Sequence, residues 1–367
     1  MVTETFANPL VHIPLYCTHD TPDYCMQYLV ELLLVCLESY FARHNTYQVL
    51  VTTNDSRPLK ILSAYQEKSQ HPFELKWVSS DELLATFKTD ESRLQDAPCL
   101  KTIFSKFHPI LNRASEAIVH VDFDTMFVSK VDFEPLFASH IGLVEANRLD
   151  PQAQPWRPTD KQADFFRIPS VAPPVATWIN TGVFAVRGSG FDICRAEVSH
   201  YLENLERAIA DGIHGSTDES IMNALAVRER DSIKVIRDYH YNFLAYYLDR
   251  DPTWKWHGKI VHFHSLKPYD FYFDGIVRYR CDQFQARRIN PELYFAVLVW
   301  CRYLHAACEG LNYDFPMISA MPREVVLQAL DLQESICLAR AALREQKPLE
   351  PRFLAVAQCK RSAWLGE

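Results

Sequence analysis

One strand that runs directly into two carboxylates constrains this chain more than any other feature. Residues 117–127 have the sequence AIVHVDFDTMF, in which an apolar run reaches Asp122 and Asp124 and then becomes apolar again. Side chains two residues apart on an extended backbone point to the same side, so both carboxylates lie on one face at the strand's end. Like charges repel there and resist desolvation, and a cation between them keeps both ionised. The stretch therefore predicts a divalent-metal site at the carboxyl end of a parallel sheet, where α/β proteins bind ligands.

The same spacing occurs a second time and serves as a comparison. Asp249 and Asp251 flank an Arg, and Pro252 follows them. This pattern is typical of a solvated turn rather than of a strand end. Only the first copy is therefore predicted to bind metal.

The composition is that of a large folded protein. Of the 367 residues, 48% are hydrophobic and 13% are aromatic, which is enough for a sizeable core. The net charge is −8, and residues 1–275 carry 26 Lys and Arg against 36 Asp and Glu. Because nucleic-acid phosphates require a basic surface, the acidic main body argues against a nucleic-acid partner.

The cysteines and the first residues bear on the cellular compartment. The ten cysteines form no C-x-x-C pair and no zinc-like spacing, so we expect reduced thiols. The opening residues, MVTETF, do not resemble a signal peptide, and the apolar runs 32–37 and 293–301 are too short to span a bilayer. We therefore expect a cytoplasmic protein.

Strand-like and helix-like segments alternate near the N-terminus. Strands are expected at 10–17, 47–53 and 73–78, with helices between them, the first over 23–43. Such βαβ alternation is typical of a parallel, Rossmann-like sheet. Pro14 inside the first strand favours an edge position or a bulge.

Later segments complete the outline. An apolar helical face runs over 103–111, and Pro109 is expected to kink or end that helix. The segment 147–174 is a Pro- and Asp-rich loop of about 28 residues, and loops of this length are commonly lids or binding segments. From residue 276 the pattern is helical, so we expect a catalytic domain at 1–275 and a helical extension at 276–367.

Four spaced motifs within residues 9–270 resemble those of GT-A glycosyltransferases, above all the retaining glycosyltransferase family 8, which includes glycogenin and bacterial lipopolysaccharide galactosyltransferases. The family's metal-binding Leu-Tyr-Leu-Asp-x-Asp strand is similar to residues 119–124, and its Phe-Asn-Ser-Gly-Val segment to residues 179–183. Its Asp-Gln and Leu-Asn pairs are similar to residues 218–223, and its late His-Phe-x-Gly-x-x-Lys-Pro-Trp segment to residues 262–269. The resemblance implies an α/β, GT-A (Rossmann-like) fold with a mostly parallel central sheet flanked by helices.

The resemblance also implies a role for each matching residue. It places a divalent ion among Asp122, Asp124 and His262, with Asp122 on the ion or on the donor ribose. The ion would act as a Lewis acid on the departing nucleoside diphosphate. Because imidazole is among the ligands, Mn²⁺ is favoured over Mg²⁺. The other implied residues are Thr18, Lys106 and Lys267 on the nucleotide and its phosphates, Asn180 and Asp218 on sugar hydroxyls, and Asp218 with Glu219 as catalytic residues.

Two positions depart from the family pattern. Ser265 stands where the family has Gly, and the gap between His262 and Lys267 is one residue shorter. Glu219 replaces the usual Gln. Beside an anomeric carbon, a carboxylate could act as a nucleophile or stabilise an oxocarbenium-like state more strongly than an amide does.

Structural interpretations stay open for the same residues. Ser216-x-x-Glu219 has the pattern of a capping box, in which the Glu219 carboxylate bonds the Ser216 amide. The remaining interpretations are a solvated strand end at Asp122 and Asp124, a hydrogen-bonded strand histidine at His262, an ordinary turn at 180–182 and a surface lysine at Lys106.

The sequence thus predicts a metal-dependent glycosyltransferase that moves a hexose from a UDP-sugar to an unidentified acceptor (a glycan, lipid-linked glycan or protein), with retention of configuration. Two alternatives belong to other classes. A haloacid-dehalogenase-like phosphohydrolase also uses Asp-x-Asp, but it needs Thr or Val four residues after the first Asp, where this chain has Met126. The other alternative is a non-catalytic nucleotide-sugar-binding protein of the same fold.

The C-terminal part has two interpretations. It carries four arginines close to aromatic residues, namely Arg278, Arg280, Arg287 and Arg288. They could face an acceptor or an anionic membrane surface, or this part could simply pack on the sheet.

Overall fold

The computed structural model describes residues 9–17, 21–89, 98–145, 156–169, 178–213, 217–245, 259–264, 268, 291–313, 315–320 and 323–324. Within them, the fold is built on a seven-stranded sheet in the order β3-β2-β1-β4-β7-β6-β8. Its strands are β1 (Leu10–Leu15), β2 (Gln48–Thr53), β3 (Phe73–Trp77), β4 (Ala117–Val121), β6 (Ile141–Glu145), β7 (Ile179–Arg187) and β8 (Ile233–Ile236). The pairings are parallel except those of β7, which is antiparallel to β4 and β6. The prediction of an α/β fold with a mostly parallel central sheet is confirmed.

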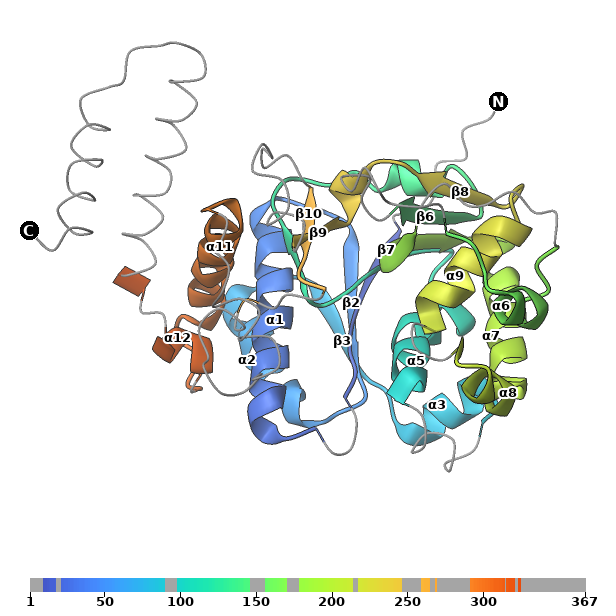
Figure 1. Ribbon diagram of the computed structural model, residues 1–367. Coiled ribbons are helices and arrows are strands. Elements are labelled where there is room, and N and C mark those ends of the chain that lie inside the picture. The colour runs from blue at the N-terminus through green and yellow to red at the C-terminus, as the bar shows by residue number, and fades with distance from the viewer. Residues whose placement is uncertain are drawn as a thin grey trace, which may run out of the picture.

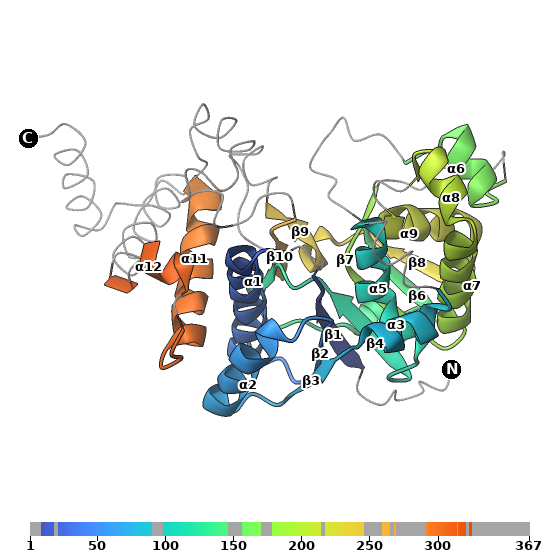
Figure 2. The same ribbon diagram turned by 90° about the horizontal axis from the view of Figure 1, so that it is seen from below.

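Helices cover both faces of this sheet (Figure 1). One face carries α1 (Asp23–Ala42) and α2 (Arg57–Ser69), with α11 (Pro291–Cys308) and α12 (Pro316–Ala320) packed on α1. The other carries α3 (Ser80–Phe87), α5 (Pro98–Leu111), α7 (Gly190–Glu203) and α9 (Thr217–Arg228), with α6 (Asp160–Phe165) and α8 (Leu205–Ala210) farther out. Figure 2 shows the same two helical layers from below. The expected domain boundary at 275 falls among residues outside the described ranges and stays a prediction.

Alternation along the strands divides the core between the two faces. On β4, Val119 and Val121 join the core that contains α1, whereas Ile118 joins the core that contains α5. His120 and Asp122 lie two and four residues after Ile118. Side chains alternate on an extended backbone, so β4 directs these two polar residues towards α5.

A second, smaller sheet lies beside the end of β4. It consists of β5 (Thr125–Phe127), β10 (Ile260–His262) and β9 (Phe243–Leu244), in the order β5-β10-β9. β10 runs antiparallel to β5, with His262 opposite Thr125, and parallel to β9. The small sheet therefore brings a late segment of the chain back to the Asp-x-Asp motif.

Two prolines lie inside regular elements of the fold. Pro14 lies in β1, which is flanked by β2 and β4, so the edge-strand prediction is wrong. The β1–β4 pairing covers only Leu10–His12, so no partner on β4 is lost at Pro14. Pro109 lies inside α5, which continues to Leu111. Its missing N–H removes the bond to the carbonyl four residues earlier, and the helix ends two residues after it, in line with the expectation that Pro109 kinks or ends the helix.

The segment expected to be one long loop contains a helix. Thr159 caps α6 by accepting from the backbone of Gln162, and the Gln162 side chain accepts from the Thr159 backbone. This is a complete capping box, and its Thr-x-x-Gln pattern was visible in the sequence. The rest of the segment, 147–155 and 170–174, lies outside the described residues, and its role as a lid stays a prediction.

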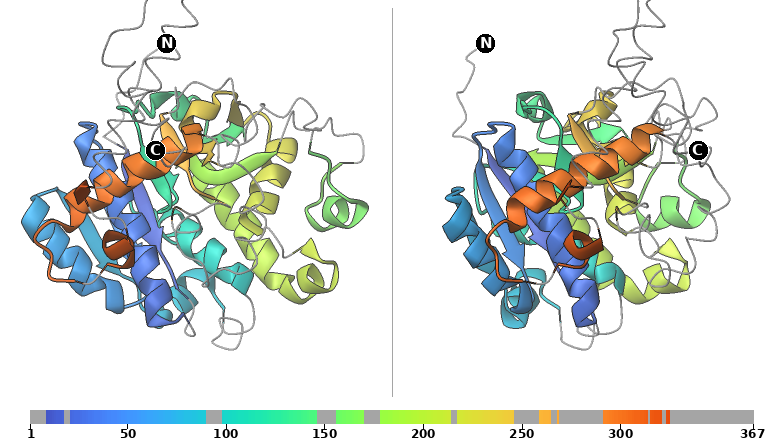
Figure 3. Two further views of the ribbon diagram at one scale, coloured as in Figure 1. Left: turned by 60° about the vertical axis from the view of Figure 1, so that its left-hand side comes forward. Right: turned by 90° about the vertical axis from the view of Figure 1, so that its left-hand side faces the viewer.

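Helix α1 is more apolar than its short runs suggested. Its segment Cys25–Ala42 has 18 residues with a mean hydropathy of 1.4, enough to cross a membrane by length and composition alone. In the fold, 67% of this segment is buried. It packs against β5 of the small sheet and against α11, which lies across it in Figure 3. Its apolar character is thus accounted for by the core.

Candidate functional site

The three predicted metal ligands meet just beyond the end of β4. The Nε2 atom of His262 lies 3.1 Å from Oδ1 of Asp124 and 3.6 Å from Oδ2 of Asp122. One ligand atom from each residue lies within 4.8 Å of the other two. Ligands at about 2.1 Å from a Mg²⁺-sized ion stand roughly 3–4 Å apart. The side chains are therefore spaced as the first ligands of one divalent cation would be, and Asp124, only 7% exposed, is no solvated strand end.

Two backbone contacts bring these ligands together. The N–H of Asp122 donates to the carbonyl of Gly182 on β7 at 2.8 Å, which extends the β4–β7 pairing by one residue. The N–H of Phe263 donates to the carbonyl of Asp124 at 2.9 Å, which extends the small sheet in the same way. The ligand positions are therefore determined by the pairing register of two different sheets.

His262 is oriented by Asn242, which lies directly before β9. The Nδ1 atom of His262 lies 2.9 Å from Oδ1 of Asn242. The Nδ2 atom of Asn242 donates to Oδ1 of Asn180 at 2.7 Å, so its Oδ1 must accept from the imidazole. His262 then carries a proton on Nδ1, and in the neutral ring its Nε2, which faces the carboxylates, has a lone pair to offer a metal. That nitrogen is buried and makes no hydrogen bond within the described residues, as expected of a metal ligand.

Lys106 on α5 balances part of the negative charge. Its Nζ lies 3.0 Å from Oδ2 of Asp122 and 2.8 Å from Oδ2 of Asp218, and it donates to Oγ1 of Thr181 at 3.0 Å. The residue is buried, so the surface-lysine interpretation is wrong. Burial would lower the pKa of Lys106, but the two carboxylates outweigh it and raise the pKa above its ordinary value. Together with Asp124, the carboxylates of Asp122 and Asp218 carry three negative charges against the one positive charge of Lys106. A divalent cation would neutralise the remaining two.

The pKa of both carboxyls that Lys106 contacts is shifted in the same direction. Burial would raise the pKa of Asp122, but Lys106 and a hydrogen bond from His120 lower it below its usual range. Burial opposes ionisation of Asp218 too, and Lys106 together with Thr181 lowers its pKa. Both groups are therefore carboxylates at neutral pH.

Glu219 lies in the first turn of α9, beside Asp218. Its Oε1 accepts from Nδ2 of Asn180 at 2.7 Å, and its Oε2 accepts from Nε1 of Trp178 at 3.1 Å. Burial, reinforced by the charge of Asp218, raises the pKa of Glu219 to about 7. Ser216, the partner in the alternative capping box, lies outside the described residues. The carboxyl group of Glu219 is thus held by two hydrogen bonds, and near pH 7 it is divided between its protonated and ionised forms.

Asn180 connects the catalytic candidates to the metal ligands. Besides Glu219, its side chain contacts Asn242 and accepts from the N–H of Gly182 at 3.0 Å. Residues 180–182 therefore belong to strand β7, and the ordinary-turn interpretation is wrong. Its expected contact with a sugar hydroxyl stays a prediction.

Two buried histidines to which the sequence analysis assigned no role, His12 and His120, also belong to the site. The Nε2 atom of His120 lies 2.8 Å from Oδ1 of Asp122, and its Nδ1 lies 3.4 Å from Nδ1 of His12. The Nε2 atom of His12 lies 2.8 Å from Oγ1 of Thr52. Burial lowers the pKa of both histidines. The available signal was a polar His120 in an otherwise apolar strand, two residues before Asp122 and hence on its face.

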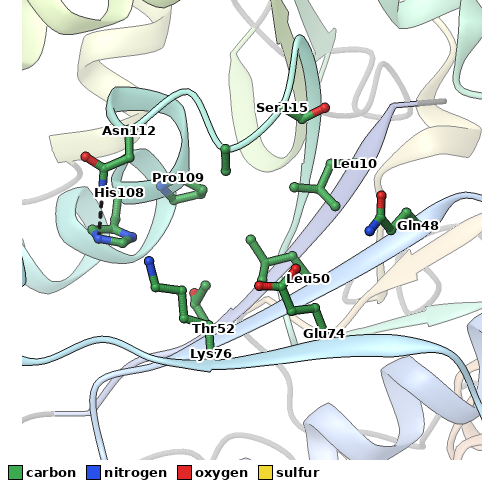
Figure 4. Close-up of a pocket in the computed structure, with 11 residues that line it drawn as sticks. Leu10, Gln48, Leu50, Thr52, Glu74, Lys76, His108, Pro109, Asn112 and Ser115 are labelled. Atoms are coloured by element: carbon green, nitrogen blue, oxygen red, sulfur yellow. Dashed lines mark hydrogen bonds between the residues drawn. The ribbon is translucent and has the colours of Figure 1, made fainter. Parts of the chain in front are cut away.

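A small pocket lies next to Thr52, on the side of the two histidines that is farther from Asp122. It has a volume of about 170 Å³ and is bounded by β1, β2, β3 and the end of α5 (Figure 4). Thr52 lines it, together with Lys76 and with His108, whose Nε2 lies 3.0 Å from the Asn112 amide. The three metal ligands are not among its lining residues, so it is separate from the metal site.

Several sequence-predicted residues lie outside the described ranges. They are Thr18, Lys267, Ser265, the comparison pair Asp249 and Asp251, and the arginines at 278, 280, 287 and 288. Their expected roles stay predictions. Of the ten cysteines, six are described as free thiols, and five of these are buried, in line with the expectation.

Comparisons with known proteins point to fold relatives only. No protein-family model matches the sequence, and no curated protein matches it in sequence. Solved glycosyltransferase structures are similar to it in fold. Mouse xyloside xylosyltransferase 1 in its apo form has 12% identity and a TM-score of 0.46, over 71% of this chain and 98% of that one. The galactosyltransferase LgtC, in complex with donor and acceptor sugar analogues, has 11% identity and a TM-score of 0.40, over 76% and 94%. The bifunctional glycosyltransferase WbbM in its apo form has 14% identity and a TM-score of 0.43, over 73% of this chain and 47% of that one.

Proposed function

We propose that this protein is a metal-dependent glycosyltransferase that transfers a hexose from a UDP-sugar to an acceptor with retention of configuration. The observation that carries the proposal is the convergence of Asp122, Asp124 and the buried Nε2 of His262. A nucleoside diphosphate is a poor leaving group unless its charge is neutralised. Asp122, Asp124 and His262 would hold the cation, which supplies Lewis-acid stabilisation of the departing diphosphate.

The donor atoms favour Mn²⁺ as the ion. Two carboxylates and one imidazole make a mixed oxygen and nitrogen set, whereas Mg²⁺ rarely accepts a nitrogen ligand. The contact between Nδ1 of His262 and Asn242 strengthens the basicity of Nε2 towards a metal. Mg²⁺ is the expected second choice.

The remaining side chains would orient the donor and provide a carboxylate beside its anomeric carbon. Lys106 would stabilise added phosphate charge, and Asp218 would accept from a sugar hydroxyl. Glu219 supplies a carboxylate held by Asn180 and Trp178, which suits a nucleophile or an electrostatic partner of an oxocarbenium-like state. A nucleophilic carboxylate leads to two displacements and hence to retention.

The test is release of nucleoside diphosphate from a panel of nucleotide sugars in the presence of Mn²⁺. We expect turnover by the wild-type protein, loss of at least 100-fold in Asp124→Asn, and no loss in Asp160→Asn, an exposed acid on α6. An Asp124→Asn variant with wild-type turnover would overturn the metal assignment. A burst of acid-labile aspartyl phosphate at Asp122 would favour the phosphohydrolase. Tight donor binding without turnover would favour the non-catalytic binding protein.

A further inference from the structure

A continuous line of polar side chains crosses the sheet from Thr52 on β2, through His12 on β1 and His120 on β4, to Asp122. His12 and His120 are register partners on adjacent strands, so their rings lie side by side. Thr52, His12 and His120 are completely buried. Burying two imidazoles beneath a sheet is costly unless each nitrogen has a partner, and here all four nitrogens have one.

The chemistry of the groups gives this line one direction. The carboxylate of Asp122 can only accept, so Nε2 of His120 carries a proton and donates to Oδ1. In a neutral ring, Nδ1 of His120 is then an acceptor, and the facing Nδ1 of His12 must donate to it. Nε2 of His12 is left as an acceptor, so the Thr52 hydroxyl donates to it. Each donor thus points towards Asp122.

We propose that Thr52, His12 and His120 are positioning residues that fix the rotation of the Asp122 carboxylate. With Oδ1 bonded to His120, Oδ2 is turned towards Lys106 and His262, where a metal ion would bind. The inference rests on the proposed function for the identity of that ion. The directions of the hydrogen bonds do not depend on it.

A competing arrangement has a different proton distribution. If His120 were an imidazolium, both its nitrogens would donate, and Nδ1 of His12 would have to accept. His12 would then carry its proton on Nε2 and donate to Thr52. The two arrangements therefore differ in which nitrogen of His12 is protonated, but in both of them Nε2 of His120 donates to Asp122 and fixes the carboxylate.

The first test is the tautomeric state of the wild-type protein, measured by two-bond ¹⁵N–¹H correlation after selective ¹⁵N-histidine labelling. His12→Gln and His120→Gln spectra assign the two signals. We expect a proton on Nε2 of His120 without metal, since this nitrogen donates to Asp122. A His120 ring with no proton on Nε2 would overturn the proposal, because Asp122 would then accept no bond from it. This test involves neither turnover nor a variant that must function.

The second test is the affinity for Mn²⁺, measured by electron paramagnetic resonance of the free ion. His120→Phe keeps a flat ring next to Phe184, whose ring centroid lies 4.9 Å away, but removes the bond to Asp122. We expect a 10- to 100-fold weaker affinity, with partial recovery in His120→Gln, which restores an N–H donor. His108→Phe is the matched control, since it also removes a buried histidine on the α5 side. An unchanged affinity in a folded His120→Phe protein would overturn the proposal.

The two proposals fail in distinguishable ways. If the protein binds Mn²⁺ and shows the expected tautomers but turns over no nucleotide sugar, the proposed function fails and the positioning role stands. If turnover requires Asp124 while His120→Phe binds Mn²⁺ like the wild type, the positioning role fails and the function stands. A kcat that recovers in His120→Phe at saturating Mn²⁺ would support positioning, because a group that took part in the chemistry would lower kcat at every Mn²⁺ concentration.

Discussion

A Cβ atom on Gly182 would lie 2.3 Å from both Nδ1 and Cε1 of the His262 ring. The absence of a side chain at this position in β7 is therefore what leaves space for the imidazole against the sheet. In Gly182→Ala the ring must move away, because no atom can approach so closely. We expect a loss of about 1–3 kcal/mol in the free energy of unfolding and at least a tenfold weaker affinity for Mn²⁺, measured by urea denaturation and calorimetric titration.

The double variant Gly182→Ala/His262→Ala provides the control. With the ring removed, most of the clash at Gly182 disappears, although Oδ1 of Asn180 still lies 2.9 Å from the added Cβ. Relative to His262→Ala alone, the added methyl should cost little stability. An equal cost in both backgrounds would mean that the ring does not occupy this position.

Lys106→Met removes the ammonium that two buried carboxylates share. Asp122 and Asp218 would then face each other without compensation, and breaking a buried pair costs about 3–5 kcal/mol. Lys76→Met is the matched control, because Lys76 pairs with Glu82 at the surface and such pairs contribute under about 1 kcal/mol. Addition of Mn²⁺ should restore part of the stability of Lys106→Met. Urea denaturation with and without Mn²⁺ gives the answer, and equal losses in the two variants would contradict the prediction.

Asn242→Leu should weaken metal binding although Asn242 is not itself one of the three candidate metal ligands. The change removes the acceptor for Nδ1 of His262, so the ring is free to take the other tautomer and to protonate the nitrogen that faces the carboxylates. Loss of such a partner lowers metal affinity by about 10- to 100-fold. The affinity for Mn²⁺, measured by calorimetry, should fall in this variant and stay unchanged in Asn112→Ala, whose side chain contacts His108 instead.

Glu219 should make the stability of the protein fall as the pH rises from about 4.5 to about 7. Its pKa is raised from 4.5 to about 7 in the folded state, mainly by burial and then by Asp218. In that interval the folded state holds more protons at this position than the unfolded state, so raising the pH favours unfolding. The resulting loss of stability is on the order of 3 kcal/mol and is complete above about pH 7.

Glu219→Gln tests this assignment. The amide has one acceptor oxygen in place of two, so it keeps the bond from Asn180 or the bond from Trp178 but not both, at a cost of about 1 kcal/mol. It does not titrate, so the decline with pH should be absent in denaturation curves recorded from pH 4 to pH 8. A wild-type slope in this variant would place the titrating group elsewhere.

The parts of the site that lie close together in the sequence could be predicted from it. Asp122 and Asp124 directly follow one apolar strand, so both carboxylates could be placed at its end, although residues 123–124 form a turn and not the extended backbone that the period of two assumed. The parallel sheet was predicted because strand-like and helix-like segments alternate along the N-terminal part of the sequence. Lys106 was found through the family resemblance, because its partners Asp122 and Asp218 come from separate elements and nothing local marks a buried lysine.

Other contacts depend on pairings that no local pattern encodes. Asn242 orients His262 because β9 and β10 are neighbours in a sheet of very short strands, which propensities do not predict. His12 meets His120 because β1 and β4 are adjacent although more than 100 residues separate them. The antiparallel direction of β7 also escaped prediction, although it brings Asn180 and Gly182 to the end of β4.

The brevity of the small sheet has a consequence for turnover. β10 is joined to β5 by three residue pairs and to β9 by two, so opening this ladder breaks few bonds. A cation shared by Asp124 and His262 would tie together positions 138 residues apart and would hold the ladder shut. Under the proposed function, fraying of the same ladder would move the imidazole away and so loosen both the ion and the nucleoside diphosphate bound to it. Loss of the ion and release of the proposed diphosphate product are therefore expected to depend on one local opening of this ladder.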